Sequence, residues 1–311
     1  MPAEPDFVAP DPREVDPRAV RRAFGRAAAT YDAAAALQRE VAARMAARLD
    51  VVKIVPAVVL DAGCGTGEAT LELAARYAGA RVVGMDIALP MLMAARYRAQ
   101  RSGSVLHRLL RPMLATSRDA VPRFVGGDVN ALPMRGVCVD VVWSNLVLQW
   151  VNDVPRAFAE FRRVLTVGGL LSFTTFGPDT LKELRGAFGD GHTHVNRFAD
   201  MHDLGDMLVH AGFADPVMDM EYVTLTYESP RALLEELKAL GATNATRGRP
   251  RGLMGRRRLA RVEQALEKLR RDGRIPATFE VVYGHAWKGE PRRTAEGLPI
   301  VAMPHGKRID R

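Results

Sequence analysis

A short glycine-rich segment near residue 60 constrains the fold of this chain more than any other feature. The apolar run at 58–60 is typical of a buried parallel strand, and Asp61 ends it. Three glycines follow at a spacing of two: Gly63, Gly65 and Gly67. The next residues predict a helix over 68–76, with Thr66 as its N-cap. A strand, a glycine turn and a helix N-terminus in this order predict a ligand that lies against bare backbone.

The residues of the turn distinguish three kinds of ligand. A dinucleotide fold uses G-x-G-x-x-G, but Glu68 occupies the third glycine position, where its charge would face a pyrophosphate. The Gly-Lys-Ser/Thr of a phosphate-binding loop is absent from the turn. An acidic residue before G-x-G-x-G instead suits a cationic ligand with an amino group. The segment resembles motif I of the class I S-adenosylmethionine (SAM) methyltransferases, and a tight turn without a ligand is the alternative.

Further acidic residues stand where later strands end. A second apolar strand at 81–85 ends at Asp86, whose carboxylate can accept hydrogen bonds from ribose hydroxyls. The methyltransferase resemblance implies that Asp128, at a third strand tip, reaches the adenine amino group while Val129 packs on the ring. Their shared position at strand ends favours one joint site over isolated helix caps. The expected cofactor-binding residues are Asp61, Gly63, Gly65, Gly67, Asp86, Ile87, Asp128, Val129 and Asn145.

The pattern along the chain predicts an α/β fold of the class I SAM methyltransferase (Rossmann-like) type. We expect a doubly wound, mainly parallel, seven-stranded sheet with a helical N-terminal lid and C-terminal substrate-recognition helices. Five stretches are predicted: a disordered N-terminus (1–17), a helical lid (18–50), a SAM-binding α/β core with five strands (51–176), a substrate-recognition region with strand-like runs at 217–226 and 277–287 (177–288), and a flexible tail (289–311). A basic insert at roughly 101–121 has no assigned role.

Composition favours a soluble enzyme of the cytoplasm. The 311 residues are 48% apolar, enough for one large core, and no apolar run approaches the length of about 18 residues that a membrane span needs. The N-terminus lacks the basic and apolar regions of a signal peptide. Two cysteines, Cys64 and Cys138, form no metal-binding pattern and favour a reducing compartment. We therefore expect no membrane and no metal.

Motifs in the downstream half narrow the resemblance to one family. They are F-x-x-A-x-x-x-Y-D from Phe24 with L-Q at 37–38, N-L-x-x-Q-W from Asn145, F-T-T-F-G-P from Phe173, H-V-N-R-F from His194, L-K-x-x-G-A from Leu237 and G-R-x-P-x-T from Gly273. Together these motifs resemble the malonyl-acyl-carrier-protein O-methyltransferases of biotin synthesis. A mitochondrial arginine hydroxylase that assists respiratory complex I assembly shares much of this half, but it lacks the Asn-Arg pair found here at 196–197. A SAM-binding hydroxylase or assembly factor of that type, and a SAM-binding protein that works only through partner contacts, remain alternatives.

The resemblance implies methylation of the free carboxylate of a malonyl group carried on acyl carrier protein or coenzyme A. A carboxylate with a pKa of about 4 is already ionised at neutral pH and needs no general base. What it needs is a cation that binds it bidentately, for which arginine is suited. The catalytic candidates are Tyr31, His194, Asn196 and Arg197, and the substrate-binding candidates are Arg197 and Lys238. The alternatives are a structural ion pair of Arg197 with Asp200 or Asp203, a packed aromatic role for Tyr31, and a solvent-facing Lys238.

The net charge of +8 is concentrated late in the chain, over 247–274. This stretch has no interleaved aromatic residues for base stacking, so we expect no nucleic acid partner. A solvated face is one interpretation of the arginines. The other is that Arg256, Arg257 and Arg258 dock an acidic protein partner, malonyl-acyl carrier protein.

Overall fold

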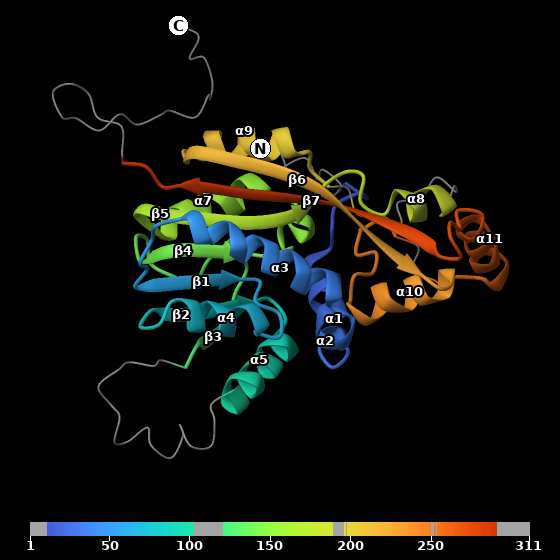
Figure 1. Cartoon of the computed structure of the whole chain (residues 1–311), viewed down its shortest axis with the longest axis horizontal. Helices are drawn as coiled ribbons and strands as arrows, with labels where there is room; N and C mark the ends of the chain where they lie inside the picture. The colour runs from blue at the N-terminus through green and yellow to red at the C-terminus, as the bar shows by residue number, and fades with distance from the viewer. Residues whose placement is uncertain are drawn as a thin grey trace, which may run out of the picture.

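Seven strands form one sheet, in the order β3-β2-β1-β4-β5-β7-β6 (Figure 1). The computed structural model describes residues 11–102, 121–188, 196, 198–249, 252 and 254–290. The strands are β1 (Val58–Ala62), β2 (Arg81–Asp86), β3 (Arg123–Gly126), β4 (Val139–Ser144), β5 (Leu165–Phe176), β6 (Ala214–Tyr227) and β7 (Ile275–Trp287). Neighbours from β3 to β5 pair in parallel, whereas β7 runs antiparallel to both β5 and β6. The predicted fold class is therefore confirmed, including the two late strands.

The central strands are mostly apolar because helices cover both faces of the sheet. Successive side chains point to opposite faces, so Val59 joins one core cluster and Leu60 the other. Helices α3 (Ala36–Arg48) and α4 (Glu68–Arg76) bury their apolar residues in the first cluster. Helices α7 (Val154–Val164) and α9 (Met201–His210) do so in the second, and α5 (Leu89–Ser102) packs on β3. The apolar run at 58–60 thus marks a strand buried on both faces.

The N-terminal segment forms helices that lie beside the carboxyl ends of the strands. Asp16 caps α1 (Pro17–Ala27) by accepting from Arg18 N, and the short α2 (Tyr31–Ala34) follows. Val15 is buried, and its N–H donates to Asn152 Oδ1 at 2.8 Å. The disorder expected for 1–17 is thus wrong for residues 11–17, because Val15 is buried and its backbone is bonded to Asn152. Residues 1–10 lie outside the described part of the chain.

The C-terminal region completes the sheet and adds a group of helices at one end of it (Figure 1). These are α8 (Lys182–Phe188), α10 (Pro230–Ala239) and α11 (Arg256–Glu267), and short 3-10 helices occur as η1 (Leu49–Val51) and η2 (Leu148–Trp150). Helix α11 packs against α8 and α10. Most of the basic insert, 103–120, and the tail from 291 lie outside the described residues.

Candidate active site

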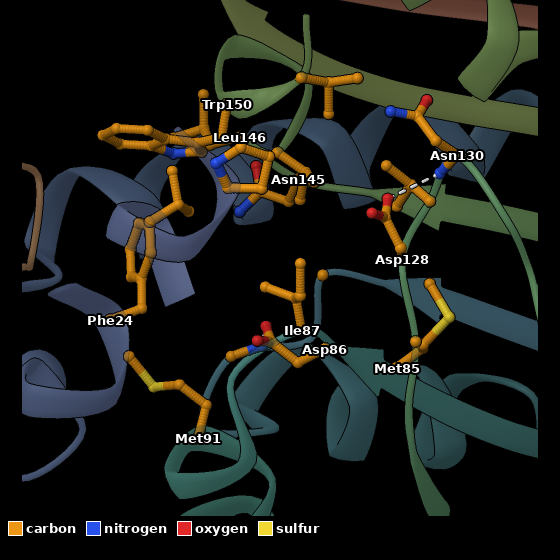
Figure 2. Close-up of a pocket in the computed structure, with 18 of the residues that line it drawn as sticks. Phe24, Met85, Asp86, Ile87, Met91, Asp128, Asn130, Asn145, Leu146 and Trp150 are labelled. Carbon is orange, nitrogen blue, oxygen red and sulfur yellow. Dashed lines mark hydrogen bonds between the residues drawn. The ribbon is translucent and has the colours of Figure 1, made fainter. Parts of the chain in front are cut away.

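A cavity of about 330 Å³ opens where the carboxyl ends of the parallel strands meet (Figure 2). We call it the strand-end cavity. Ten of its lining residues decide its chemistry: Phe24, Tyr31, Gly63, Gly65, Asp86, Ile87, Asp128, Val129, Asn130 and Asn145. Parallel strands bring these residues together because their carboxyl ends lie at one edge of the sheet, the usual ligand position in open α/β folds. Eight of the nine expected cofactor-binding residues line this cavity or its smaller neighbour, which is described below; Gly67 is the exception.

The glycine turn holds its shape through hydrogen bonds from its backbone N–H groups to residues of β2. Gly63 N donates to Met85 O at 2.7 Å, and Gly65 N donates to Asp86 Oδ2 at 3.0 Å. Gly63 has φ +87°, and a Cβ atom there would lie 2.1 Å from Val147 Cγ2. Any side chain at position 63 would therefore both strain the backbone and displace the loop that follows β4. The turn leaves bare backbone facing the cavity.

Helix α4 begins differently from the sequence prediction. Its N-cap is Gly67, in the left-handed region, and no side chain caps it. Thr66 Oγ1 instead donates to Asp32 Oδ1 at 2.6 Å, and the Asp32 carboxylate also pairs with Arg98. The prediction of Thr66 as N-cap is wrong because its hydroxyl is used by a residue of the N-terminal lid. The hydrogen bond ties the lid to the glycine turn.

Asp86 is fixed at the end of β2 by the backbone around it. Its Oδ1 accepts from Ala88 N at 2.7 Å, and its Oδ2 is the acceptor of the Gly65 bond. Burial raises the pKa of the Asp86 carboxyl above its ordinary value, against the lowering effect of these backbone donors. The Asp86 side chain nevertheless borders the strand-end cavity (Figure 2). Asp86 is thus a preorganised acceptor for hydroxyl groups.

Asp61 lies beneath the glycine turn and borders a second cavity of about 100 Å³, which we call the turn cavity. The Asp61 side chain is buried, and its Oδ2 accepts from Thr70 Oγ1 at 2.5 Å. Burial, together with the nearby charge of Asp86, raises the pKa of the Asp61 carboxyl to about 7. A cationic group bound in the turn cavity would stabilise the ionised form of Asp61.

The third strand tip contributes Asp128 and its neighbours to the strand-end cavity. Asp128 Oδ1 accepts from Asn130 N at 2.9 Å, which forms a tight turn (Figure 2). Asn130 Oδ1 is buried and has no hydrogen-bond partner among the described residues. Sequence reasoning missed Asn130, because only the Asp-x-Asn spacing hinted at this turn. An unpaired buried acceptor at a cavity wall points to a ligand that supplies a donor.

Asn145 stands between the two cavities and joins three elements. Its Nδ2 donates to Gln38 O at 3.1 Å, and its Oδ1 accepts from Thr174 Oγ1 at 2.7 Å. The next residue, Leu146, has φ +53°, which is unusual for a residue with a branched side chain. The strained loop after β4 is held by Leu146 N, which donates to Thr174 Oγ1 at 2.9 Å. Asn145 therefore fixes the wall between the cavities, and its side-chain atoms are already engaged.

Aromatic side chains of the N-terminal helices and of η2 line one side of the strand-end cavity. Phe24 packs edge-to-face on Trp150 with ring centroids 5.2 Å apart, and it also contacts Tyr31 at 6.4 Å (Phe24 and Trp150 are labelled in Figure 2). Burial and the carboxylates of Asp86 and Asp32 raise the pKa of the Tyr31 hydroxyl. Tyr31 therefore keeps its proton at neutral pH and can donate a hydrogen bond but cannot act as a base.

The expected substrate residues are only partly placed. Asn196 is buried, and its Oδ1 has no partner among the described residues. Asn196 lines a narrow cavity of about 70 Å³ together with Gln38 and Gln149, and we call it the amide cavity. Asn196 also lines a larger cavity of about 870 Å³, which we call the outer cavity. Lys238 is exposed on α10 and lines none of these four cavities. His194 and Arg197 lie outside the described residues.

Comparison with known proteins connects this geometry to a family. A model of the methyltransferase domain matches residues 60–173. A malonyl-[acyl-carrier protein] O-methyltransferase of Gallionella capsiferriformans is 53% identical over 289 residues, which cover 92% of this chain and 96% of the relative. The protein of the same name in Nitrosospira multiformis is 54% identical over 283 residues, covering 89% and 91%.

The chain belongs to the malonyl-[acyl-carrier protein] O-methyltransferase family. Solved structures support the fold of this family member. The YcgJ protein of Bacillus subtilis covers 79% of this chain and 98% of its own with a TM-score of 0.55 at 16% identity. A putative methyltransferase of Bacillus halodurans covers 80% and 98% with a TM-score of 0.52 at 16% identity. At 16% sequence identity these structures support only the fold of this chain.

The cofactor is S-adenosyl-L-methionine, and the described residues fit it. Asp86 offers an acceptor for ribose hydroxyls, and the carboxyl of Asp61 suits a cationic group in the turn cavity. Ile87 and Val129 supply apolar wall, while Asn130 offers an unpaired acceptor. The two cavities meet along Tyr31, Gly63, Gly65 and Asn145, so one extended ligand can occupy both.

We expect Asp86→Ala to weaken SAM binding by roughly 1.5–3 kcal/mol, the range for a lost hydrogen bond to a charged group. The Gly65 N–H would lose its acceptor as well, so the turn should become more mobile. Isothermal titration calorimetry measures the affinity, and Asp140→Ala, at the amino end of β4, serves as a distant control. Unchanged affinity in a folded Asp86 variant would remove this residue from the site.

We expect Asp61→Asn to stabilise the ligand-free protein in a pH-dependent way. The folded pKa of about 7 lies above the unfolded value, so ionising Asp61 costs folding free energy that grows as the pH rises toward 7. The gain in unfolding free energy over the unmutated protein should be larger at about pH 8 than at about pH 5.5, by on the order of 1–2 kcal/mol. Urea unfolding at the two pH values measures it. Equal gains at both would contradict the raised pKa.

Proposed function

We propose that this protein transfers the methyl group of SAM to the free carboxylate of a malonyl group on acyl carrier protein, an early step of biotin (pimeloyl) synthesis. The observation that carries this conclusion is the match, over about nine-tenths of the chain, to relatives of that name. Neither a protein-arginine hydroxylase nor a non-catalytic SAM-binding protein is supported by these relatives. Methylation hides the charge of the malonyl group, so that enzymes which elongate neutral acyl chains can accept the product.

The residues of the chain need only orient the reactants and exclude water. The residues of the strand-end and turn cavities would hold SAM, which would supply an electrophilic methyl group on its sulfonium. The malonyl carboxylate oxygen would bond to that methyl carbon as the carbon–sulfur bond breaks and the neutral thioether leaves, without any proton transfer. The acceptor carboxylate is ionised at neutral pH, which agrees with a site where Tyr31 retains its proton. Phe24 and Trp150 shield the strand-end cavity from one side. Orientation in a water-poor site is an established source of rate acceleration.

Incubation with SAM carrying a labelled methyl group tests the function directly. Malonyl-acyl carrier protein and malonyl-coenzyme A should each gain one labelled methyl group, detected by mass spectrometry. The acetyl thioesters serve as matched controls, because they lack the free carboxylate and should gain none. Absence of label on both malonyl substrates, or equal labelling of the acetyl controls, would contradict the proposal.

Arg197 remains our choice as the cation that binds the malonyl carboxylate, on the strength of the Asn-Arg pair in the sequence. Arg197→Ala should lower kcat/KM for malonyl substrates by an amount that corresponds to a loss of about 2–5 kcal/mol of transition-state stabilisation. The affinity for SAM should stay nearly the same. Arg197→Lys should restore only part, because a point charge cannot reproduce the planar fork. Arg135→Ala, an exposed arginine ahead of β4, is the control. Normal turnover by the Arg197→Ala variant would refute the assignment.

We also propose that Arg256 and Arg257 help dock the acidic carrier protein. Other arginines of the basic stretch have structural partners, as Arg247 does with Glu14 and Arg270 with Glu267. Arg256 and Arg257 are exposed in the first turn of α11, where positive charge opposes the helix dipole. Neither forms an ion pair within the described residues. Their helix packs on α8, which contributes Arg185 to the outer cavity.

The double variant Arg256→Glu/Arg257→Glu should slow turnover of malonyl-acyl carrier protein much more than that of malonyl-coenzyme A. Arg258, the third predicted docking residue, is half-buried and is left unchanged for this reason. Raising salt until the screening length falls from about 10 Å to about 3 Å should reproduce the selective loss in the unmutated enzyme. Arg81→Glu/Arg123→Glu, at the amino ends of β2 and β3, is the charge-matched control. If the ratio of the turnover rates of the two substrates does not change, these arginines form only a solvated face.

No helix in the described ranges is both long and apolar enough to cross a membrane. The cytoplasmic location expected from the sequence stays a prediction. Fractionation of cells that express a tagged chain would test it.

A further inference from the structure

The outer cavity is the largest of the four cavities described above. Its volume of about 870 Å³ lies within the range of about 300–1,000 Å³ that is usual for ligand pockets. It shares Val151 and Asn152 with the strand-end cavity, so a ligand in the outer cavity has a direct path to the cofactor site. Arg185 of α8 also lines the outer cavity, and α8 packs against α11, the proposed docking helix. A substrate carried by a docked protein can therefore reach the cofactor through this cavity.

The buried wall of the outer cavity is mostly apolar. Its buried aliphatic residues are Val15, Leu148, Val154 and Leu204. Two buried polar residues of the wall bond to each other, since Thr175 Oγ1 donates to Gln149 Oε1 at 3.3 Å. Burying a charge in such a place is much less favourable than burying an apolar or hydrogen-bonded neutral group. The interior of the outer cavity thus suits a neutral chain.

The charged groups of the outer cavity lie at its rim, where they are partly or fully exposed. The acidic ones are Asp11, Glu14, Asp200 and Asp203. Asp11 forms an ion pair with Arg13 at 2.6 Å, and Glu14 forms one with Arg247 at 3.2 Å. Asp200 is the N-cap of α9, and Asp203 is exposed to solvent in the first turn of that helix. These charges are compensated at the surface, so they do not make the interior a site for ions.

Asn196 is the buried polar residue of this wall that has an unpaired atom. Its side chain is only 6% exposed, and its Oδ1 has no hydrogen-bond partner among the described residues. A buried acceptor without a donor costs folding free energy, which a ligand N–H group would recover. Gln38 Oε1, from the wall of the adjoining amide cavity, is a second unpaired acceptor. The outer cavity therefore suits a long neutral ligand that carries hydrogen-bond donors.

We infer that the outer cavity holds the pantetheine arm through which the malonyl thioester is attached, and that Asn196 Oδ1 accepts an N–H group of this arm. This inference rests on the proposed function. The arm is a neutral chain with two secondary amides, and acyl carrier protein and coenzyme A share it. Its N–H groups match the unpaired acceptor, and its aliphatic carbons match the apolar wall. Asn196, a catalytic candidate in the sequence, thus binds the substrate away from the reacting carboxylate.

A substrate without the arm tests the role of Asn196. Asn196→Leu keeps the volume of the side chain but removes the acceptor. It should lower kcat/KM for malonyl-coenzyme A by about tenfold or more, because an amide N–H of the arm loses its partner. For the S-methyl thioester of malonate, which has no amide, the change should stay within about threefold. Gln100→Leu, at an exposed position of α5, is the control.

Three further measurements separate the arm from the group to which it is attached. Malonyl-pantetheine, malonyl-coenzyme A and malonyl-acyl carrier protein share the arm. Asn196→Leu should therefore lower kcat/KM for all three by factors that agree within about threefold. The affinity for SAM, measured by calorimetry, should change by less than about threefold, since Asn196 lines neither the strand-end cavity nor the turn cavity.

A variant that fills the outer cavity tests the place of the arm. Ala199→Trp adds a large side chain to the wall of this cavity. It should lower kcat/KM for malonyl-coenzyme A by about tenfold or more and affect the S-methyl thioester much less. Ala211→Trp is the matched control, because Ala211 packs against the same core cluster as Ala199 but lines none of the four cavities. Cooperative thermal unfolding shows whether each variant is folded.

The outcomes separate failure of the inference from failure of the function. If the unmutated protein methylates no malonyl thioester, the proposed function fails and this inference fails with it. If the unmutated protein is active, the role of Asn196 is overturned when Asn196→Leu leaves kcat/KM for malonyl-coenzyme A unchanged or lowers it equally for the S-methyl thioester. A loss confined to coenzyme A, to the carrier protein or to SAM affinity would overturn it as well. Normal turnover of malonyl-coenzyme A by a folded Ala199→Trp variant would show that the arm lies elsewhere.

Discussion

Two carboxyl groups lie close together at the carboxyl ends of adjacent parallel strands: Asp61 is buried, and Asp86 is half-buried at the wall of the strand-end cavity. Burial disfavours their charged forms, and the charge of Asp86 further raises the pKa of Asp61. Two neighbouring carboxylates in such a place lower the free energy of unfolding unless hydrogen bonds and a cation stabilise them. The Gly65 N–H and the Thr70 hydroxyl provide part of that stabilisation. A cationic ligand at this place would supply the rest, and the glycine turn and the N-terminal helices are arranged around it.

The lid and the sheet are coupled through a few polar contacts across long sequence separations. Asp32 receives the Thr66 hydroxyl and the Arg98 guanidinium, which fastens the lid to the glycine turn and to α5. Asn145 reaches from the end of β4 to the backbone of Gln38 in α3. These contacts place Tyr31 at the border of the strand-end and turn cavities, and Gln38 at the border of the turn and amide cavities. The N-terminal helices and the carboxyl ends of the strands are thus joined by specific polar contacts.

The sequence predicted the features that depend on local pattern. The strands follow from apolar runs, and Asp61, Asp86 and Asp128 were placed because parallel strands bring their ends to one edge. The sequence did not reveal that Thr66 would bond to Asp32 or that Val15 would be buried beside Asn152, because both depend on how distant segments pack.

The amide cavity shows the same limit of sequence reasoning. Gln38 stood in a motif that carried the family resemblance, but no role followed from it. Only the three-dimensional arrangement shows that its Oε1 is buried without a hydrogen-bond partner among the described residues, and that Gln38 lines a cavity.

The most direct test of this account is the number of protons released when SAM binds. At roughly pH 6.5, an Asp61 carboxyl whose pKa is about 7 holds its proton in much of the free protein, and a bound cation should expel it. Calorimetry in buffers of different ionisation enthalpy measures this release. We expect a fraction of a proton released per SAM bound by the unmutated protein and much less by the Asp61→Asn variant. A binding enthalpy that does not depend on the buffer would contradict the claim that a buried carboxyl pair awaits a cationic cofactor.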